Sequence, residues 1–572
     1  MQNKLFISIS KNILILIVIF ITFSCKTHPN TDNIYNITKS VETDSAMVVT
    51  AHPLATEIGL EVLRAGGNAI DAGIAVQFAL AVCYPGAGNI GGGGFLLYRE
   101  ASGNTAALDY REKAPSSATE TMYLDEQGNP VENLSISGPL AAGVPGTVDG
   151  MIQAFEKYSR LRDWNRLLQP AINLAAKGFL ITKNEAEHLN DNQEKFKKFN
   201  RTTTAFHKDM WKVGDLLVQK DLAETLTRIA KNGRAGFYEG TTAQLILDEM
   251  KGQNGIINLK DLKDYRAVWR KPVVYTYRGN EIISMPPPSS GGIALGQLLK
   301  IIEPYDMKAL GFQSAAAVHL ITEAERRVYA DRAHYLGDPD FINVPQETLL
   351  DSTYLTRRMA DFNPRQASKS QNIRYGTTES EETTHYSIVD SYGNALSVTT
   401  TLNGSYGSHT VVRGAGFILN NEMDDFSIKP GTPNLYGLVG AEANKIEPGK
   451  RMLSSMTPTI ISQNGKLKMV VGTPGGSTII TSVFQIIINV LDFEMDINKA
   501  VQSPRFHHQW LPDVIYCETD AIQTKQRKIL ESIGHTFKNR EPIGRVEGIL
   551  IDKNNTIHGA ADHRGDDDAK GF

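Results

Sequence analysis

The chain has 572 residues, and its hydrophobic content of 41% is enough for one large core or for more than one domain. Its formal net charge of -4 gives no electrostatic case for a nucleic-acid-binding protein. The three cysteines, Cys25, Cys83 and Cys517, argue against a disulfide framework, and none has the spacing of zinc ligands.

Residues 1–25 have the pattern of an export signal. Lys4 and Lys11 supply positive charge ahead of an apolar run, residues 13–21, that is shorter than the roughly 20 residues of a membrane span. The run ends at Cys25 in a sequence similar to the cleavage site of bacterial lipoproteins. We expect a lipid on Cys25, a flexible tether over residues 26–46, and an exported, periplasmic, membrane-anchored protein. Plain secretion is the alternative.

The globular part begins near Met47. Helices are expected over residues 57–64 and around residues 70–82, where apolar residues recur every four positions. The glycine-rich stretch 86–94 precedes a strand, whereas phosphate-binding loops follow a strand and open a helix. Close packing of the backbone is therefore the favoured interpretation of these glycines.

Arg111 stands in a charged cluster at the end of the next strand. Its guanidinium has the planar fork that grips a carboxylate through paired hydrogen bonds. A salt bridge to Asp109 or Glu112 is the competing interpretation, and the residues alone favour it.

The middle of the chain is predicted to be mainly helical, with apolar spacing of helical period at residues 166–176, 221–231 and 315–335. A β-patterned stretch, residues 265–283, interrupts it and leads through a proline-rich corner into a helix at 293–302. Residues 363–382 are polar and lack apolar periodicity, so they predict an exposed, mobile loop.

Thr383 follows this loop and opens a β-patterned run. A threonine hydroxyl needs a base beside it to act as a nucleophile, and an N-terminal threonine carries one in its own α-amine, whose pKa is about 8. A cut between Glu382 and Thr383 would create nucleophile and base in one residue. An ordinary strand start is the alternative, and for a Thr-Thr pair taken alone it is the more frequent one.

Several candidate residues lie beyond this junction. Runs at 383–389 and 395–401 predict a hairpin that returns Thr401 and Asn403 to the side of Thr383. The acidic cluster 419–427 is suited to a cationic amine, a metal or a turn cap. A tight turn, residues 473–477, precedes an apolar helix at 478–491. The backbone N–H groups of this turn are suited to stabilising an oxyanion, and a plain turn is the alternative.

Motifs in the same order throughout residues 47–572 resemble the γ-glutamyltranspeptidase family, also called γ-glutamyltransferases or glutathione hydrolases. The segments that carry the resemblance are 108–114, 383–390, 420–427, 453–456, 472–477 and 504–510. The resemblance implies an α+β fold, the four-layer αββα sandwich of the N-terminal nucleophile hydrolases. It also implies a precursor that cuts itself between Glu382 and Thr383 into a large subunit, 47–382, and a small subunit, 383–572.

The resemblance further implies the catalytic residues. Thr383 would attack the γ-glutamyl amide of glutathione and related compounds, Thr401 would hydrogen-bond the nucleophile, and Gly475 and Gly476 would form the oxyanion hole. The γ-glutamyl-enzyme would be resolved by water or by an amino acid or peptide acceptor. Neither a metal nor an organic cofactor is implied.

The resemblance also implies which residues bind the substrate. Arg111, Ser454 and Ser455 would bind the substrate α-carboxylate, and Asn403, Glu422 and Asp425 would bind its α-ammonium. Tyr436 matches the lid tyrosine of bacterial members, and Glu422 stands where some bacterial relatives have glutamine. Two alternatives remain open: a related cephalosporin or glutaryl acylase, and a surface-anchored binding lipoprotein that never matures.

Overall fold

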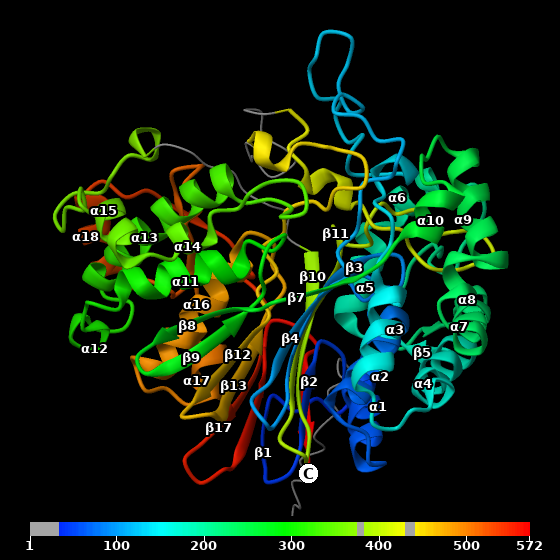
Figure 1. Cartoon of the computed structure of the whole chain (residues 1–572), viewed down its shortest axis with the longest axis horizontal. Helices are drawn as coiled ribbons and strands as arrows, with labels where there is room; N and C mark the ends of the chain where they lie inside the picture. Colours follow the sequence, from blue (N-terminus) through cyan, green and yellow to red (C-terminus); the bar gives the residue numbers. More distant parts are fainter. Residues whose placement is uncertain (1–33, 374–381, 430–440) are drawn as a thin grey trace, which may run out of the picture.

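Two antiparallel β-sheets lie face to face at the centre of the molecule, and helices cover the outer face of each (Figure 1). The computed structural model describes residues 34–373, 382–429 and 441–572. Each sheet has seven strands in this described part of the chain. The predicted αββα sandwich is confirmed.

The first sheet has the order β1-β18-β17-β13-β12-β9-β8 and the second the order β19-β2-β10-β11-β3-β4-β7. The strands of the first are Ser40–Thr43 (β1), Ile557–Ala561 (β18), Glu547–Ile551 (β17), Lys466–Gly472 (β13), Thr459–Gln463 (β12), Asn280–Ser284 (β9) and Val273–Tyr277 (β8). Those of the second are Asp568–Gly571 (β19), Met47–Thr50 (β2), Glu382–Val389 (β10), Ala395–Asn403 (β11), Gly93–Arg99 (β3), Thr105–Asp109 (β4) and Val268–Arg270 (β7). Small sheets are formed by Phe506–His507 (β14), Ile515–Cys517 (β15) and Phe537–Asn539 (β16), and by Phe179–Leu180 (β5) and Leu216–Leu217 (β6).

Helices from separate parts of the chain cover the two sheets. Those packed on or beside the first sheet are Gly291–Ile302 (α11), Met307–Leu310 (α12), Ala315–Tyr335 (α13), Gln346–Leu349 (α14), Ser352–Arg358 (α15), Thr478–Leu491 (α16), Ile497–Gln502 (α17) and Thr524–Ser532 (α18). Those on the side of the second sheet are Pro53–Arg64 (α1), Ala69–Cys83 (α2), Thr147–Tyr158 (α3), Trp164–Lys177 (α4), Lys183–Asp191 (α5), Gln193–Phe199 (α6), Lys220–Asn232 (α7), Ala235–Tyr238 (α8), Gly240–Gly252 (α9) and Leu259–Asp264 (α10). No helix among the described residues is long and apolar enough to cross a membrane.

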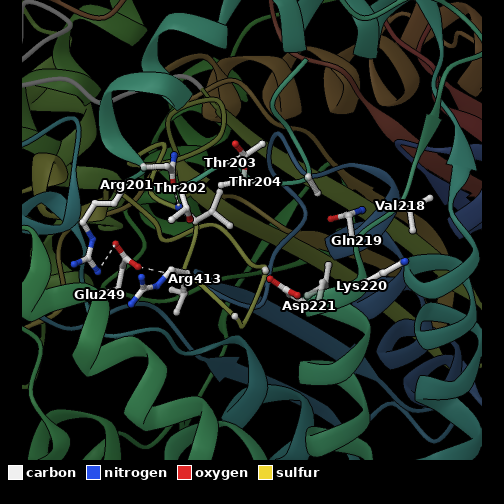
Figure 2. A pocket seen from close by; sticks show the side chains of 17 residues that line it. Arg201, Thr202, Thr203, Thr204, Val218, Gln219, Lys220, Asp221, Glu249 and Arg413 are labelled. Atoms are coloured by element: carbon white, nitrogen blue, oxygen red, sulfur yellow. Dashed lines mark hydrogen bonds and ion pairs between the residues drawn. The ribbon is translucent and has the colours of Figure 1, made fainter. Parts of the chain in front are cut away.

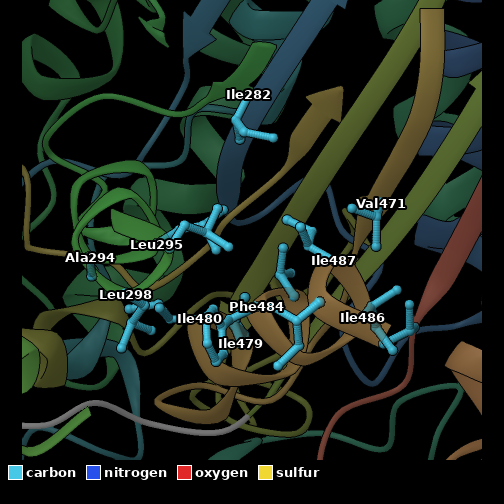
Figure 3. Close-up of a cluster of buried hydrophobic side chains, with 14 of the residues drawn as sticks. Ile282, Ala294, Leu295, Leu298, Val471, Ile479, Ile480, Phe484, Ile486 and Ile487 are labelled. Atoms are coloured by element: carbon cyan, nitrogen blue, oxygen red, sulfur yellow. The ribbon is translucent and has the colours of Figure 1, made fainter. Parts of the chain in front are cut away.

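The packing of α11 and α16 against the first sheet forms much of one hydrophobic core (Figure 3). Leu295 and Leu298 of α11 and Ile480, Phe484 and Ile487 of α16 are all fully buried. Burial of each such side chain contributes about 1.5–3 kcal/mol. A second core lies between the other sheet and α2, whose residues are all buried. Both cores hold the central strands in place.

The two strands that flank the predicted junction lie in the middle of the second sheet. β10 pairs with β2 on one side and with β11 on the other, and β11 pairs with β3. The segments before and after residue 382 therefore interleave in one sheet, so neither is a separate folding unit.

Helix boundaries follow the sequence-based predictions closely at residues 315–335 and 478–491, and the predicted hairpin is confirmed as β10 and β11. The stretch 265–283 is not one β-unit, because β7 joins the second sheet while β8 and β9 join the first. The predicted tether is too long: residues 40–43 form β1, which pairs with β18. The amine of Lys39 also donates to the carbonyls of Asp562, Gly565 and Asp567 at 2.7–2.8 Å.

Candidate active site

Thr383 lies at the start of β10, directly opposite Thr401 of β11. Opposite residues in an antiparallel pair share one face of the sheet, so both hydroxyl-bearing side chains are on the same side. Thr383 is buried, with 5% of its surface exposed. The register shifts between Glu382 and Thr383, which leaves Leu402 as an extra residue in β11. This β-bulge falls at the predicted junction.

Asn403 ends β11 in a left-handed conformation, with a φ of 74°, which asparagine tolerates better than most residues. Its backbone N–H donates to the Thr401 hydroxyl at 2.7 Å, and its side-chain amide donates to the Asn421 carbonyl at 3.0 Å. The turn therefore connects the strand of Thr383 and Thr401 to the acidic segment that follows Asn421.

Arg111 points into that acidic segment. Its Nη1 lies 2.5 Å from Glu422 Oε2, and its Nη2 donates to Asp425 Oδ2. The guanidinium is buried, and it also donates to the carbonyls of Met452 and Leu453. The predicted salt bridge to a neighbour in sequence is minor, because Glu112 is 3.7 Å away. The structure thus brings together a predicted cation and two predicted anions from distant parts of the chain.

Ser454 and Ser455 follow the backbone carbonyls that Arg111 contacts. The Ser455 hydroxyl is buried and has no hydrogen-bond partner among the described residues. Asn444, which the sequence analysis missed, holds this region together: it accepts from the Leu453 N–H and donates to the Asp425 carbonyl. No local sequence pattern identifies Asn444, because its two partners, Asp425 and Leu453, lie in other segments of the chain.

Gly475 and Gly476 lie in the loop after β13. The Ser397 hydroxyl donates to the Val471 carbonyl, and an added Cβ on Gly472 would fall 2.2 Å from the His385 ring. Ser397 lies opposite Ser387 in the hairpin, so Val471 lies near Ser387, and the next residue, Gly472, lies beside His385. The end of β13 therefore runs toward the start of β10. The following loop consequently heads toward the Thr383 end of β10. Gly475 and Gly476 have φ values of 131° and 55°, in the region that favours glycine.

His385 lies between the two sheets. Its ring contacts the hydroxyls of Thr399 at 2.9 Å and Ser387 at 3.1 Å. Burial lowers the pKa of His385 to about 3, so the ring is neutral near pH 7. The ring therefore fills the space between β10 and β13 without adding a charge.

The glycine-rich stretch that leads into β3 and forms its first two residues packs closely against neighbouring backbone, including that of the same hairpin. A Cβ on any of Gly91, Gly92, Gly93 or Gly94 would lie 2.1–2.5 Å from a backbone carbonyl oxygen, that of Thr401 included. The prediction of close backbone packing is confirmed. Burial also raises the pKa of Glu112, beside Gly93, to about 8, which favours the neutral carboxyl near pH 7.

Comparison with known proteins decides the family. Residues 55–572 match the family model described as Gamma-glutamyltranspeptidase. The glutathione hydrolase proenzyme of Pseudomonas sp. (strain A14) is 47% identical over 516 residues, which cover 89% of this chain and 90% of that protein. The chain belongs to the γ-glutamyltranspeptidase family. The glutathione hydrolase proenzyme of Escherichia coli (strain K12) is 45% identical over 534 residues, or 92% of each chain.

Structural comparison agrees with this family's fold. The crystal structure of cephalosporin acylase from Bacillus halodurans matches with a TM-score of 0.81 over 96% of this chain and 99% of that one. Its 24% sequence identity makes this a likeness of fold alone. Members of the γ-glutamyltranspeptidase family are hydrolases or transferases, so the chain is an enzyme of this kind.

The segment leading to the junction is anchored more firmly than its polar composition predicts. Ser370 and Ile373 are buried, and the indole N–H of Trp510 donates to both of their carbonyls at 2.9 and 2.8 Å. Arg326 links the Ser370 hydroxyl to the Asp513 carboxylate. The predicted exposed loop is therefore wrong for these two residues. Its remainder, residues 374–381, lies outside the described residues.

Three predicted features fall outside the described part of the chain: Cys25, Tyr436 and the side chain of Glu382. One group among the described residues has the spacing of metal ligands, namely His319, Glu323 and His535. Glu323 is already paired with Arg326 at 3.3 Å and with Arg327 at 2.6 Å. A divalent ion there would have to displace two guanidinium groups.

Proposed function

We propose that this protein is a γ-glutamyltranspeptidase and glutathione hydrolase that cuts itself between Glu382 and Thr383. Two observations support the cut: family membership, with close relatives named proenzymes, and the β-bulge that separates Glu382 from Thr383. After the cut, residues up to 382 would form the large subunit and residues 383–572 the small one.

In the proposed reaction the free α-amine of Thr383 accepts the proton of its own hydroxyl while Oγ bonds to the γ-glutamyl carbonyl carbon. The carbonyl electron pair moves to oxygen, where the N–H groups of Gly475 and Gly476 stabilise it. Collapse of this intermediate expels the amine of cysteinylglycine with the proton. Water then releases glutamate, or the amine of an amino acid or peptide takes the γ-glutamyl group. Thr401 orients the nucleophile.

The observation that carries the substrate assignment is the buried contact of Arg111 with Glu422 and Asp425. A free amino-acid head group presents one anion and one cation, which are the complements of these side chains. We propose that the substrate α-carboxylate binds the guanidinium of Arg111, with Ser454 and Ser455. The substrate α-ammonium would bind Glu422, Asp425 and Asn403. The unpartnered hydroxyl of Ser455 supports an oxygen ligand there.

The proposal also assigns roles to two residues outside the described part of the chain. Tyr436 would close over the bound substrate as a lid residue, since it follows Asp425 in a proline- and glycine-rich part of the sequence. Cys25 would carry the lipid that anchors the exported protein in the periplasm, since it ends an apolar run of signal-peptide length.

A cephalosporin or glutaryl acylase is the second candidate, because the acylase of Bacillus halodurans shares this fold. A glutaryl group has no α-ammonium, so it gives the pair Glu422 and Asp425 nothing to bind. Faster hydrolysis of a glutaryl anilide than of a γ-glutamyl anilide would favour the acylase.

Intact mass, N-terminal sequencing and γ-glutamyl-p-nitroanilide hydrolysis, all measured on one purified sample, test the proposal. We expect two chains, the smaller beginning with Thr383, together with activity. A single uncut chain without activity would support the third candidate, a binding lipoprotein that never matures.

Gly472→Ala tests the contact between the two sheets. The new Cβ would fall 2.2 Å from the His385 ring, so β13 and its glycine loop must move away from β10. A misplacement of about 1 Å costs roughly 10²-fold in rate. We expect kcat for γ-glutamyl-p-nitroanilide to fall by about that factor. Gly86→Ala is the matched control, since nothing lies within 3.7 Å of its added Cβ. Equal kcat values for the two variants would contradict the proposed role of this contact.

A further inference from the structure

The turn that contains Gly475 and Gly476 leaves the N–H groups of both glycines free. Neither N–H donates to an acceptor among the described residues. The carbonyls are engaged instead. That of Gly475 accepts from the hydroxyl and the N–H of Thr478 at 2.8 and 3.0 Å, and that of Gly476 accepts from the Ile479 N–H at 3.1 Å. The acceptors of the turn therefore attach it to the start of α16, while its donors stay available to a ligand oxygen.

Tyr329 of α13 holds the next carbonyl of this turn. Its hydroxyl donates to the carbonyl oxygen of Ser477, which is the N-cap residue of α16. Both side chains are buried, and Arg540 also lies close enough to this hydroxyl to interact with it electrostatically. Since Ser477 directly follows Gly476, this hydrogen bond ties the turn to a second helix, from a residue 148 positions away in the sequence.

The ring of Tyr329 is itself held by His507 of β14. The two rings pack edge to face, with their centroids 5.6 Å apart. His507 Nε2 lies 2.8 Å from Gln509 Oε1, and its Nδ1 lies 2.9 Å from the Thr481 hydroxyl of α16. An amide oxygen only accepts, so Nε2 carries the proton and Nδ1 accepts from Thr481. Burial lowers the pKa of His507 to about 3, so the ring is neutral near pH 7 and keeps these two hydrogen bonds.

The turn thus lies between two helices that are fixed by other contacts. In α16 the side chains of Ile480, Phe484 and Ile487 are fully buried in the hydrophobic core (Figure 3). The two glycines have no side chain that could anchor them, so the direction of their N–H groups depends on the carbonyl contacts of the turn. Donors of an oxyanion hole are effective because they already point at the oxygen before the charge develops.

We propose that Tyr329 is a positioning residue of the oxyanion hole. Its hydroxyl fixes the Ser477 carbonyl and thereby the direction of the Gly475 and Gly476 N–H groups, and His507 fixes the Tyr329 ring. This inference rests on the proposed reaction, in which those N–H groups stabilise the tetrahedral intermediate. It also gives a role to the segment 504–510, one of the motifs that carry the family resemblance.

Tyr329→Phe tests the role, because it removes the hydroxyl and keeps the ring. Loss of a whole oxyanion-hole donor costs about 10²–10³-fold in kcat, and a donor that is only misdirected costs less. We expect kcat for γ-glutamyl-p-nitroanilide to fall by about tenfold and KM to change by less than about twofold, as for an interaction made only in the transition state. Tyr277→Phe is the matched control. Tyr277 is also buried, its hydroxyl donates to Asp492 at 2.6 Å, and it lies on β8 at the edge of the first sheet, so kcat should not change.

Two inhibitors separate misdirected donors from a general loss of structure. The analogue of glutamate with a boronic acid in place of the γ-carboxyl forms a tetrahedral adduct with the Thr383 hydroxyl, and one oxygen of the adduct takes the place of the oxyanion. L-Glutamate forms no such adduct. In Tyr329→Phe the Ki of the boronate should rise by the factor by which kcat falls, because it resembles the transition state, and the Ki of glutamate should stay unchanged. An equal rise in both Ki values would overturn the positioning role.

Inhibitor binding outside the active site needs its own control. A pocket of about 260 Å³ lies beside Lys220 and Arg413, and none of the candidate active-site residues lines it (Figure 2). Lys220→Ala, an exposed residue of this pocket, should leave kcat and both Ki values unchanged. An unaltered kcat in Tyr329→Phe would overturn this inference alone. An uncut and inactive protein without any substitution would overturn the proposed function, and this inference with it.

Discussion

Replacing Thr383 by alanine is expected to leave a single uncut chain without measurable γ-glutamyl hydrolysis. The substitution removes the hydroxyl that would attack both the Glu382–Thr383 bond and the substrate carbonyl. Loss of a nucleophile costs at least about 10⁴-fold in comparable enzymes. Denaturing gel electrophoresis and intact mass measure the cut, and γ-glutamyl-p-nitroanilide release measures the activity.

Two companion variants make this result specific. Thr384 is the adjacent threonine, buried on the opposite face of β10, and its hydroxyl has no partner among the described residues. Thr384→Val should therefore cut and turn over normally, whereas Thr383→Ser keeps a hydroxyl and should retain part of both functions. If Thr383→Ala matured and hydrolysed substrate at the normal rate, Thr383 would not be the nucleophile.

Local pattern accounts for what the sequence predicted well. The helix at 315–335 is bounded by Ser314, whose hydroxyl caps the Ala317 N–H, and the hairpin consists of two β-patterned runs joined by a turn around Gly393. Such signals lie within a few residues of the element that they specify. The catalytic and substrate-binding candidates were found differently, through the resemblance of long motifs to a family.

Long-range contacts account for what the sequence did not predict. Nothing near Ser40 indicates a strand, because its partner Ala560 is at the other end of the chain. Ser370 and Ile373 look like exposed loop residues, yet Trp510 binds both. The composition of a segment reports its own hydrophobicity and not the polar group that another segment brings to it.

The electrostatics of Arg111 show the same limit. From sequence, the acids beside it were its favoured partners, and in the structure the distant Glu422 and Asp425 hold the guanidinium. Without ligand one guanidinium is shared by two carboxylates, so this set carries an excess negative charge. Binding of an amino-acid head group would bring an ammonium for the two acids and a carboxylate for the guanidinium, so each buried charge would keep a partner of opposite sign.

Arg111→Ala is expected to spare the self-cleavage and to raise KM for γ-glutamyl-p-nitroanilide by about 10²-fold or more. Loss of one partner of a buried charge pair typically costs 2–5 kcal/mol, and each 1.4 kcal/mol is a factor of about ten. The cut itself needs Thr383 and its surroundings but no substrate carboxylate, so mass analysis should still find two chains.

The substitution also leaves Glu422 and Asp425 buried without their cation, so a general loss of structure must be separated from loss of binding. Arg111→Lys keeps the positive charge but not the planar fork. It should fold and cut like the unaltered protein while KM still rises, by less than in Arg111→Ala. Arg166→Ala, an exposed arginine on α4, is the matched control and should leave KM unchanged. An unaltered KM in a well-folded, fully cut Arg111→Ala protein would mean that the substrate carboxylate binds elsewhere.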